Sequence, residues 1–406
     1  MSSVKRKPRL AVVSPFLGKS YGTERTVIEW LNHLPDAFEI HIYSQNVTDL
    51  DPDRFTWHRI PALPGPHLLN FVWWFAANHI WRALDSSLRR LRYDLVYSPG
   101  INCFDADVIS VHIVFAEYLR QARSKLGFAQ NQVQDWPRLL HRKAYYRLIV
   151  ALENHIYSNK DTLLVLYAKK TAKDLERFYG RRDPLPVLYL GLDHEIFNVG
   201  RRAQLRAQAR QEMGFTADDL VLLLVGNDLL KKGISVLLET MTRLRDSQIH
   251  LMIVGREDPR PFQAMVLANN LGDRVRFLPA RNDVEYYYAS ADVYTGPSLE
   301  DTFALPPAEA MACGLPVIVS SENGTFEIIT PGIDGMILQD PNDADGLASM
   351  IRQLSDKNLR ERLGKNAAQT AQQYTWARNG QDLAVIFEEI LQRKARSSSQ
   401  TLVQEM

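Results

Sequence analysis

Short apolar segments alternate with stretches of helical periodicity along both halves of the chain. The segment LVLLLV at residues 220–225 is one example, and it is followed by ISVLLETMTRL at 234–244, in which apolar residues recur every three or four positions. The first segment is typical of a buried strand and the second of an amphipathic helix. Strands that alternate with helices in this way form a parallel, doubly wound sheet. The sequence therefore predicts an α/β protein.

The alternation is interrupted near residues 180–200, where Pro184 and Pro186 lie in a turn-rich segment. We expect a linker there, with one domain over residues 1–190 and a second over 191–377. A helix should follow at 378–394, and a Ser-rich disordered tail at 395–406. The predicted strands lie at 9–16, 38–45, 93–100, 105–115, 161–168 and 185–193, and then at 220–227, 249–255, 275–280, 291–298, 315–320 and 334–339.

Composition narrows the class of protein. A chain of 406 residues with 46% hydrophobic and 23% charged residues is long enough for two or three domains. Its two cysteines, Cys103 and Cys313, lie in separate halves and match no metal or disulfide spacing, which favours a reducing, cytoplasmic location. No apolar stretch approaches the roughly 18 residues of a membrane-spanning helix. Neither half shows G-x-G-x-x-G after its first strand, which disfavours an NAD dehydrogenase.

The net charge of +1 hides an asymmetry between the two halves. Residues 1–200 carry 26 Lys and Arg against 20 Asp and Glu, a balance of +6, and the remainder carries −5. The basic first half indicates either an anionic partner or a solvated basic face. Composition does not choose between these two interpretations.

Two carboxylates flank the start of a short helix in PSLEDTFALPPAEAMACGLP, at residues 297–316. Asp301 and Glu309 are separated by seven residues, with Asp301 after a predicted buried strand and Glu309 in the first turns of the helix. Ligands of open α/β sheets bind at the carboxyl ends of the strands, and helix N-termini favour phosphate. The pair therefore suits sugar and ribose hydroxyls beside a phosphate. A solvated acidic loop before an ordinary helix is the alternative.

A lysine pair marks the corresponding position at the start of the second half. In LLLVGNDLLKKGISVLLE, Lys231 and Lys232 precede Gly233 at the start of a helix that follows a strand. A lysine there is able to reach a diphosphate at the mouth of the sheet. The alternative is a solvated pair at a helix start.

These motifs, in this order, resemble retaining glycosyltransferase family 4, also called group 1, of the GT-B fold. The resemblance covers about residues 8–393, and the VGND…KKG and VHIVFAEY segments are most similar to the lipopolysaccharide-core glucosyltransferase branch. It implies two facing Rossmann-like, doubly wound domains with a cleft between them. The N-terminal domain would bind the acceptor and the second domain the nucleotide sugar. The C-terminal helix would pack back on the first domain.

The resemblance also assigns roles to single residues. It implies three catalytic residues, which are His112 beside the reacting sugar carbon, Lys232 at the diphosphate and Asp301 at the sugar hydroxyls. The family has an arginine where this chain has Asn227. Ala280 and Arg281 would contact the base, whereas Asp283 is expected to cap the next helix. The residues expected to bind the donor are Gly22, Asn227, Lys231, Arg281, Phe303, Ala304, Leu305 and Glu309.

The activity that follows is retaining transfer of a sugar from a nucleotide-diphosphate sugar, with UDP as the expected carrier. The acceptor would be a glycan, a lipid-linked glycan or a lipopolysaccharide-type molecule. We expect no metal, since no Asp-x-Asp pair follows a strand at the expected positions. We also expect no cofactor and no nucleic-acid partner. Two alternatives stay open: a nucleotide-sugar epimerase or hydrolase of the same fold, and a non-catalytic nucleotide-sugar-binding protein.

The segment at residues 67–92 predicts a place for an anionic membrane surface. Phe71, Trp74 and Trp81 lie near helical spacing, and Arg82, Arg89, Arg90 and Arg92 follow them, as in a helix at a membrane interface. The protein would then be peripheral on the inner face of the membrane. The alternative is that the aromatic stripe packs against the sheet as part of the core.

Overall fold

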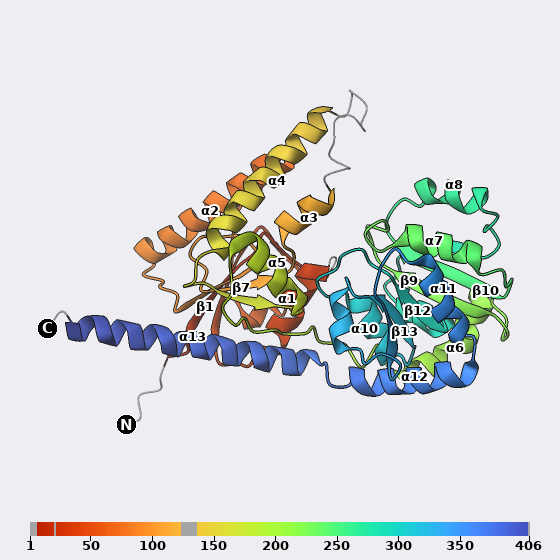
Figure 1. Ribbon diagram of the computed structural model, residues 1–406. Helices are drawn as coiled ribbons and strands as arrows, with labels where there is room; N and C mark the ends of the chain where they lie inside the picture. Colours follow the sequence, from red (N-terminus) through yellow and green to blue (C-terminus); the bar gives the residue numbers. More distant parts are fainter. Residues whose placement is uncertain (1–5, 20–21, 123–135, 405–406) are drawn as a thin grey trace. The chain divides into compact units, whose positions relative to one another are not determined.

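The computed structural model describes residues 6–19, 22–122 and 136–404 and divides the chain into two compact units (Figure 1). Unit 1 comprises Met1–Tyr189 together with Trp376–Met406, and unit 2 comprises Leu190–Thr375. Each unit is an α/β layer structure around its own parallel sheet.

The sheet of unit 1 has six parallel strands in the order β5-β3-β1-β6-β7-β8. Its register at the centre pairs Leu10 of β1 with Leu95 of β6. A separate short sheet pairs β2 with β4. The strands of this unit are β1 (Arg9–Val13), β2 (Phe16–Leu17), β3 (Glu39–Ser44), β4 (Asn46–Val47), β5 (Thr56–Arg59), β6 (Leu95–Pro99), β7 (Val108–Val111) and β8 (Leu163–Leu166).

Helices cover both faces of this sheet, and the two longest before the C-terminus, α2 and α4, run side by side (Figure 1). Their inner sides join the sheet residues in one hydrophobic core, in which Trp74 and Ile149 are buried. The helices are α1 (Gly22–His33), α2 (His67–Leu88), α3 (Phe115–Ala122), α4 (Trp136–Tyr157) and α5 (Lys170–Tyr179), with a 3-10 turn at Pro52–Arg54.

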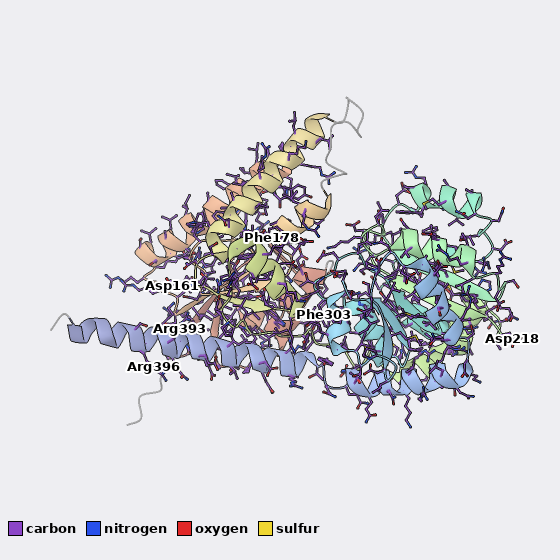
Figure 2. The ribbon with its side chains drawn as sticks, in the orientation of Figure 1. Asp161, Phe178, Asp218, Phe303, Arg393 and Arg396 are labelled. Carbon is purple, nitrogen blue, oxygen red and sulfur yellow. The ribbon has the colours of Figure 1, made fainter. Side chains whose placement is uncertain are left out.

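The last helix, α13 (Trp376–Gln404), belongs to unit 1 and packs along α1. The ring of Phe387 contacts Phe38 at 5.8 Å and Tyr97 at 5.7 Å. Farther along, Arg393 donates to the carbonyl of Asp161 at 3.1 Å (Figure 2). The predicted disordered tail is wrong up to Gln404, because the helix continues through the serines, and Ser397 donates back to the Arg393 carbonyl at 3.1 Å.

The sheet of unit 2 also has six parallel strands, in the order β11-β10-β9-β12-β13-β14. Its strands are β9 (Leu220–Val225), β10 (Ile249–Gly255), β11 (Val275–Pro279), β12 (Val293–Gly296), β13 (Val317–Ser320) and β14 (Gly335–Leu338). Its helices are α6 (Val199–Met213), α7 (Ile234–Arg243), α8 (Arg260–Ala268), α9 (Glu285–Ser290), α10 (Leu305–Ala312), α11 (Ala344–Gln353) and α12 (Lys357–Ala371), with a 3-10 helix, η4, at Gly324–Ile328.

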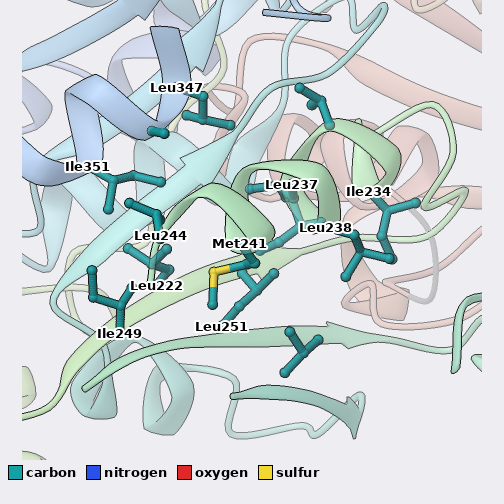
Figure 3. Close-up of a cluster of buried hydrophobic side chains, with 14 of the residues drawn as sticks. Leu222, Ile234, Leu237, Leu238, Met241, Leu244, Ile249, Leu251, Leu347 and Ile351 are labelled. Carbon is teal, nitrogen blue, oxygen red and sulfur yellow. The ribbon is translucent and has the colours of Figure 1, made fainter. Parts of the chain in front are cut away.

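The core of unit 2 forms where α7 and α11 pack on one face of the sheet. Figure 3 shows Leu237 and Met241 of α7 meeting Leu222 and Leu251 of the strands, with Ile351 of α11 beside them. All five side chains are buried. Because these residues are aliphatic and lie at helical spacing, one face of α7 is held against the sheet along its length.

The two sheets share one strand order, in which the first and fourth strands of each unit are neighbours. The connections run in opposite directions from these central pairs, β1–β6 and β9–β12, so each unit has a switch point where ligands bind in such folds. The predicted α/β class with two Rossmann-like sheets is confirmed. One predicted strand is wrong: within 185–193 the structure has two isolated bridges, Val187 to Leu166 and Leu192 to Thr375, and the sixth strand of unit 1 is β5 instead.

The docking of α13 generates a stability prediction. Replacing buried Phe387 with alanine leaves a cavity against Phe38 and Tyr97, so unit 1 should lose about 3–5 kcal/mol of unfolding free energy. Urea unfolding of the whole protein measures it. Val385→Ala on the exposed side of the same helix is the matched control and should change stability by less than about 1 kcal/mol. Equal effects of the two variants would contradict this packing.

Candidate functional site

The loop between β9 and α7 is shaped by two glycines. Gly233 has φ +83°, and a side chain there would lie 2.1 Å from the carbonyl oxygen of Pro297. Gly226 has φ +158° and is packed less closely, since a Cβ at this position would lie 3.0 Å from Cε of Lys232. Gly233 therefore lets this loop lie directly on the loop after β12, and the Lys232 side chain folds over Gly226.

Two ion pairs join these two loops at the carboxyl ends of β9 and β12. Lys232 pairs with Asp301, and Lys231 pairs with Glu300. The backbone adds a third link, in which the Leu299 amide donates to the Lys231 carbonyl at 2.8 Å. Burial works against the charge of Lys231, but the carboxylates of Glu300 and Asp301 outweigh it and raise its pKa. Two cations and two anions thus lie together at the switch point of unit 2.

Asp301 is fixed through its backbone as well as its side chain. Its amide donates to the Glu322 carbonyl at 2.9 Å, and its carbonyl accepts from the Gly324 amide at 3.0 Å. These bonds attach the β12–α10 loop to the segment that follows β13. The position of the Asp301 carboxylate is therefore set by two loops and one lysine.

Glu309 lies inside α10 and is buried, with 4% of its surface exposed. The phenol of Tyr288 in α9 donates to its Oε2 at 2.8 Å. A buried carboxylate needs such partners to stay charged. Sequence analysis missed this tyrosine, because nothing in the run Tyr286–Tyr288 shows which ring faces α10.

The segment that enters α10 contains Phe303, Ala304 and Leu305, with Phe303 labelled in Figure 2. Leu305 is the first helical residue, and the next two are prolines, which have no amide hydrogen. The Ala304 amide donates to Thr325 Oγ1 at 3.1 Å, so in this arrangement it is not an open phosphate donor. The assignment of Ala304 to the donor site stays a prediction.

A cavity of about 490 Å³ opens at the carboxyl ends of β9, β10 and β11. Ile253 and Phe277 give it an apolar floor, and Ala280 lies at its edge. Arg281 does not line it. Its guanidinium binds Asp283 at 2.8 Å and Glu212 at 3.0 Å. The Arg281 side chain is therefore held by two carboxylates outside this cavity, and its contact with the base stays a prediction.

Two further sequence assignments change around this cavity. Asp283 does not cap α9 with its side chain, because its carboxylate is held by Arg281 and the cap position is Val284. Asn227 is exposed, and its Oδ1 accepts from the Arg256 amide at 2.8 Å. Asn227 thus links the ends of β9 and β10. It does not supply the positive charge of the arginine that the family has at this position.

In unit 1, His112 follows β7 and lines a second cavity, of about 400 Å³. Its Nε2 lies 3.1 Å from both Ser110 Oγ and Tyr167 OH. Burial lowers the pKa of His112 far below its usual value, so the ring is neutral at neutral pH. A neutral imidazole with fixed hydroxyl neighbours holds one orientation.

Glu153 of α4 fixes the helix that follows His112. Its carboxylate accepts from the amides of Phe115 at 2.9 Å and Ala116 at 3.2 Å, which are the first residues of α3, and it also accepts from the Tyr179 phenol. Burial raises the pKa of Glu153 to about 7. Sequence analysis did not identify Glu153, because the contact joins residues far apart along the chain.

Two other predictions for unit 1 concern Gly22 and the aromatic stripe of α2. Gly22 is the first residue of α1, and a side chain there would meet no atom within 4 Å, so packing does not require a glycine. The prediction that the aromatic stripe of α2 faces a membrane is wrong. Trp74 is 2% exposed, and Arg82 is buried in a bidentate pair with Asp105. This face of α2 belongs to the core.

The described parts of the chain hold neither a metal cluster nor a membrane-spanning helix. Among those residues, no cluster of three or more His, Cys, Asp or Glu side chains is arranged to hold a metal ion. Within the same ranges, every helix is too short or too polar to cross a membrane. Cys103 and Cys313 are both buried free thiols.

Comparison with known proteins identifies the family of unit 2. Residues 206–370 match the model of the glycosyl transferases group 1. This match lies within unit 2 and confirms the group 1 resemblance that the sequence predicts. A D-inositol 3-phosphate glycosyltransferase of Streptomyces bingchenggensis is 31% identical over 253 residues, covering 58% of this chain and 54% of the relative. The chain thus spans a little over half the length of such relatives.

Two further proteins resemble the chain over more of its length. The lipopolysaccharide glucosyltransferase WaaG of Escherichia coli is 27% identical over 264 residues, covering 63% of this chain and 67% of WaaG. A crystal structure of WaaG superposes with a TM-score of 0.74 at 22% identity, covering 93% and 99% of the two chains. Anabaena Alr3699/HepE, solved with UDP-glucose, gives a TM-score of 0.69 at 19% identity, covering 94% and 99%. These structures establish the GT-B fold.

The closeness of the two loops in unit 2 generates a prediction. In Gly233→Ala the new methyl group would meet Pro297 and the backbone would be strained at positive φ, so the variant should be destabilised by at least about 1–2 kcal/mol. Thermal unfolding measures the loss. Gly272→Ala is the control, because a Cβ there meets nothing within 4 Å. If both variants unfold at the same temperature, the two loops are not in contact as described.

Proposed function

We propose that the protein is a retaining glycosyltransferase that uses a nucleotide-diphosphate sugar, with UDP as the carrier. The acceptor would be a glycan, a lipid-linked glycan or a lipopolysaccharide-type molecule. The observation that carries the proposal is the group at the switch point of unit 2, where Lys231 and Lys232 lie with Glu300 and Asp301. The family match and the UDP-glucose complex of HepE, a protein of the same fold, support the choice of donor.

The arrangement of charges suits departure of a diphosphate. Lys232 lies over Gly226 and is only partly exposed, so its charge is desolvated and poorly screened. A donor diphosphate at this edge would share Lys232 with Asp301 and gain charge as the sugar bond breaks. A cation placed in advance stabilises that developing charge. Asp301 would hold the lysine in position before the donor binds and accept sugar hydroxyls afterwards.

Other residues complete the donor site in this proposal. Glu309 would accept the ribose hydroxyls, with Tyr288 fixing its Oε2. The base would enter the cavity beside Phe277 and Ala280. His112 of unit 1 would serve the sugar from the acceptor side as a neutral ring. Retention of configuration is inferred from the family resemblance, and we propose a cytoplasmic location on the same basis.

The reaction is proposed to need no metal. Lys231 and Lys232 would supply the positive charge that a divalent cation supplies elsewhere. Release of nucleoside diphosphate from a panel of nucleotide sugars, with and without EDTA, tests both donor use and metal independence. An epimerase or hydrolase would turn over donor without an acceptor. A binding protein would be stabilised by the donor without turning it over.

Two substitutions separate the proposed roles of the carboxylates. Glu309→Gln should weaken nucleoside-diphosphate binding by about 1.5–3 kcal/mol, because a charge-assisted hydrogen bond to the ribose is lost. Asp301→Asn should reduce transfer more than it reduces nucleotide affinity. Calorimetric titration with UDP and a product-release assay measure the two effects.

Glu322→Gln, on the loop after β13, is a control of the same charge change. It should keep nucleotide affinity, because the contact to Asp301 uses the Glu322 backbone. Unchanged UDP binding in Glu309→Gln would contradict the assignment of the ribose site.

The proposal also places unit 1 at an anionic membrane surface, through the opposite face of α2 from the one predicted. That face is apolar and exposed, and it ends at Arg89, Arg90 and Arg92, which are also exposed. Its exposed large side chains are Leu69, Val72, Ile80, Leu84 and Leu88. A helix with such a row inserts shallowly among lipid headgroups, and the arginines favour anionic ones.

Co-sedimentation with vesicles tests this surface. Wild-type protein should bind vesicles containing phosphatidylglycerol, and binding should fall as salt rises. Leu84→Gln/Leu88→Gln should release most of the protein. The control is Met265→Gln/Leu267→Gln, which changes exposed apolar residues of α8 in unit 2. Equal binding by both double variants, or no binding at low salt, would contradict the proposed surface.

A further inference from the structure

The cavity of unit 1 lies at the switch point of the first sheet. Residues after β1, β3, β6 and β7 line it, together with α1, α2 and α4. At about 400 Å³ it has room for one sugar ring and part of a neighbouring group. The polar and aromatic side chains in its wall indicate which class of molecule binds there.

One acceptor atom in the cavity wall has no partner among the residues that the structure describes. Gln45 is 6% exposed and lines the cavity. Its Nε2 donates to Asn70 Oδ1 at 3.3 Å, but its Oε1 is buried without a hydrogen bond among the described residues. Buried polar atoms in folded proteins are nearly always paired, so this oxygen lacks a donor that a ligand would bring.

A second group in the wall is also able to accept a hydrogen bond from a ligand. Glu24, in the first turn of α1, lines the cavity, and burial raises the pKa of its carboxyl group. No lysine or arginine is among the described residues that line it. The excess positive charge of residues 1–200 is therefore not gathered in this cavity. A phosphate or carboxylate would bring only more acceptors and negative charge, whereas a hydroxyl brings a donor.

Aromatic rings form another part of the cavity wall. Tyr145 of α4 contacts His67 and Phe71 of α2, with ring centroids 4.6 Å and 5.8 Å apart. All three residues line the cavity. A wall with both rings and polar groups fits a molecule that has hydroxyls on one edge and C–H groups on its face, as a pyranose has.

We propose that this cavity binds a neutral, hydroxyl-bearing unit of the acceptor, a sugar or polyol without phosphate or carboxylate on the part that enters. One of its hydroxyls donates to Gln45 Oε1, and Glu24 accepts from another. Its apolar face lies against the aromatic rings. The inference deepens the proposed function by naming the acceptor class, but the binding itself does not depend on donor turnover.

Saturation-transfer NMR on the full chain tests the proposal with matched probes. These are the methyl glycosides of glucose, galactose and mannose, and the 6-phosphates of the same three sugars. At least one neutral glycoside should bind, and more tightly than the phosphate of its own sugar. Gln45→Leu should weaken that binding by about 3- to 10-fold, the effect of losing one hydrogen bond. Gln211→Leu, exposed on α6 in unit 2, is the control and should not change it.

A second variant keeps the test decisive if Gln45→Leu does not fold. Glu24→Lys places a cation in the wall and should shift preference toward the 6-phosphates. The proposal is overturned if a phosphate binds better than its neutral partner in the wild type, if no neutral glycoside binds, or if both cavity variants behave as wild type. If glycosides bind as expected but no nucleotide sugar is turned over, the cavity proposal stands and the transferase proposal fails.

Discussion

The ion pairs Lys231–Glu300 and Lys232–Asp301 are the interaction on which the account of the site depends. They join the loop after β9 to the loop after β12, the two central strands of the second sheet. The close approach that allows them requires Gly233 against Pro297. Charged groups that are partly buried interact strongly only when they are paired, and here each cation has its own carboxylate. A dianionic ligand at this edge enters a site whose cations are already in place.

The same topology gives each unit a switch point at the corresponding place in its sheet. In both sheets the chain reverses its direction of winding beside the first strand, which leaves the loops after the central strands free to diverge. At this edge of its sheet, unit 2 has lysines and carboxylates. At the same edge of its own sheet, unit 1 has aromatic rings, Gln45 and His112. The difference in chemistry matches a charged donor in one unit and a neutral acceptor unit in the other.

Much of the fold could be predicted because buried parallel strands are continuous apolar runs, as in Leu220–Val225. The edge strand β5, with the sequence TWHR, was missed since it has no such run. Asp301, Glu309 and the lysines could be named as candidates from the sequence because one short motif holds each pair. Other features depend on tertiary contacts, which sequence spacing does not show. Arg281 pairs with Glu212 and Asp283. The aromatic face of α2 is the buried face.

The most direct test of the central claim is the rate of nucleoside-diphosphate release by Lys232→Ala, measured with EDTA present and compared with wild type and Lys231→Ala. We expect the wild type to consume a nucleotide sugar and Lys232→Ala to lower the rate by about 10²–10³-fold, with stability largely kept. Lys231→Ala should have the smaller effect, because this lysine pairs with Glu300 instead of Asp301. Near-normal release by Lys232→Ala, or activity that returns only when Mg²⁺ or Mn²⁺ is added, would contradict it.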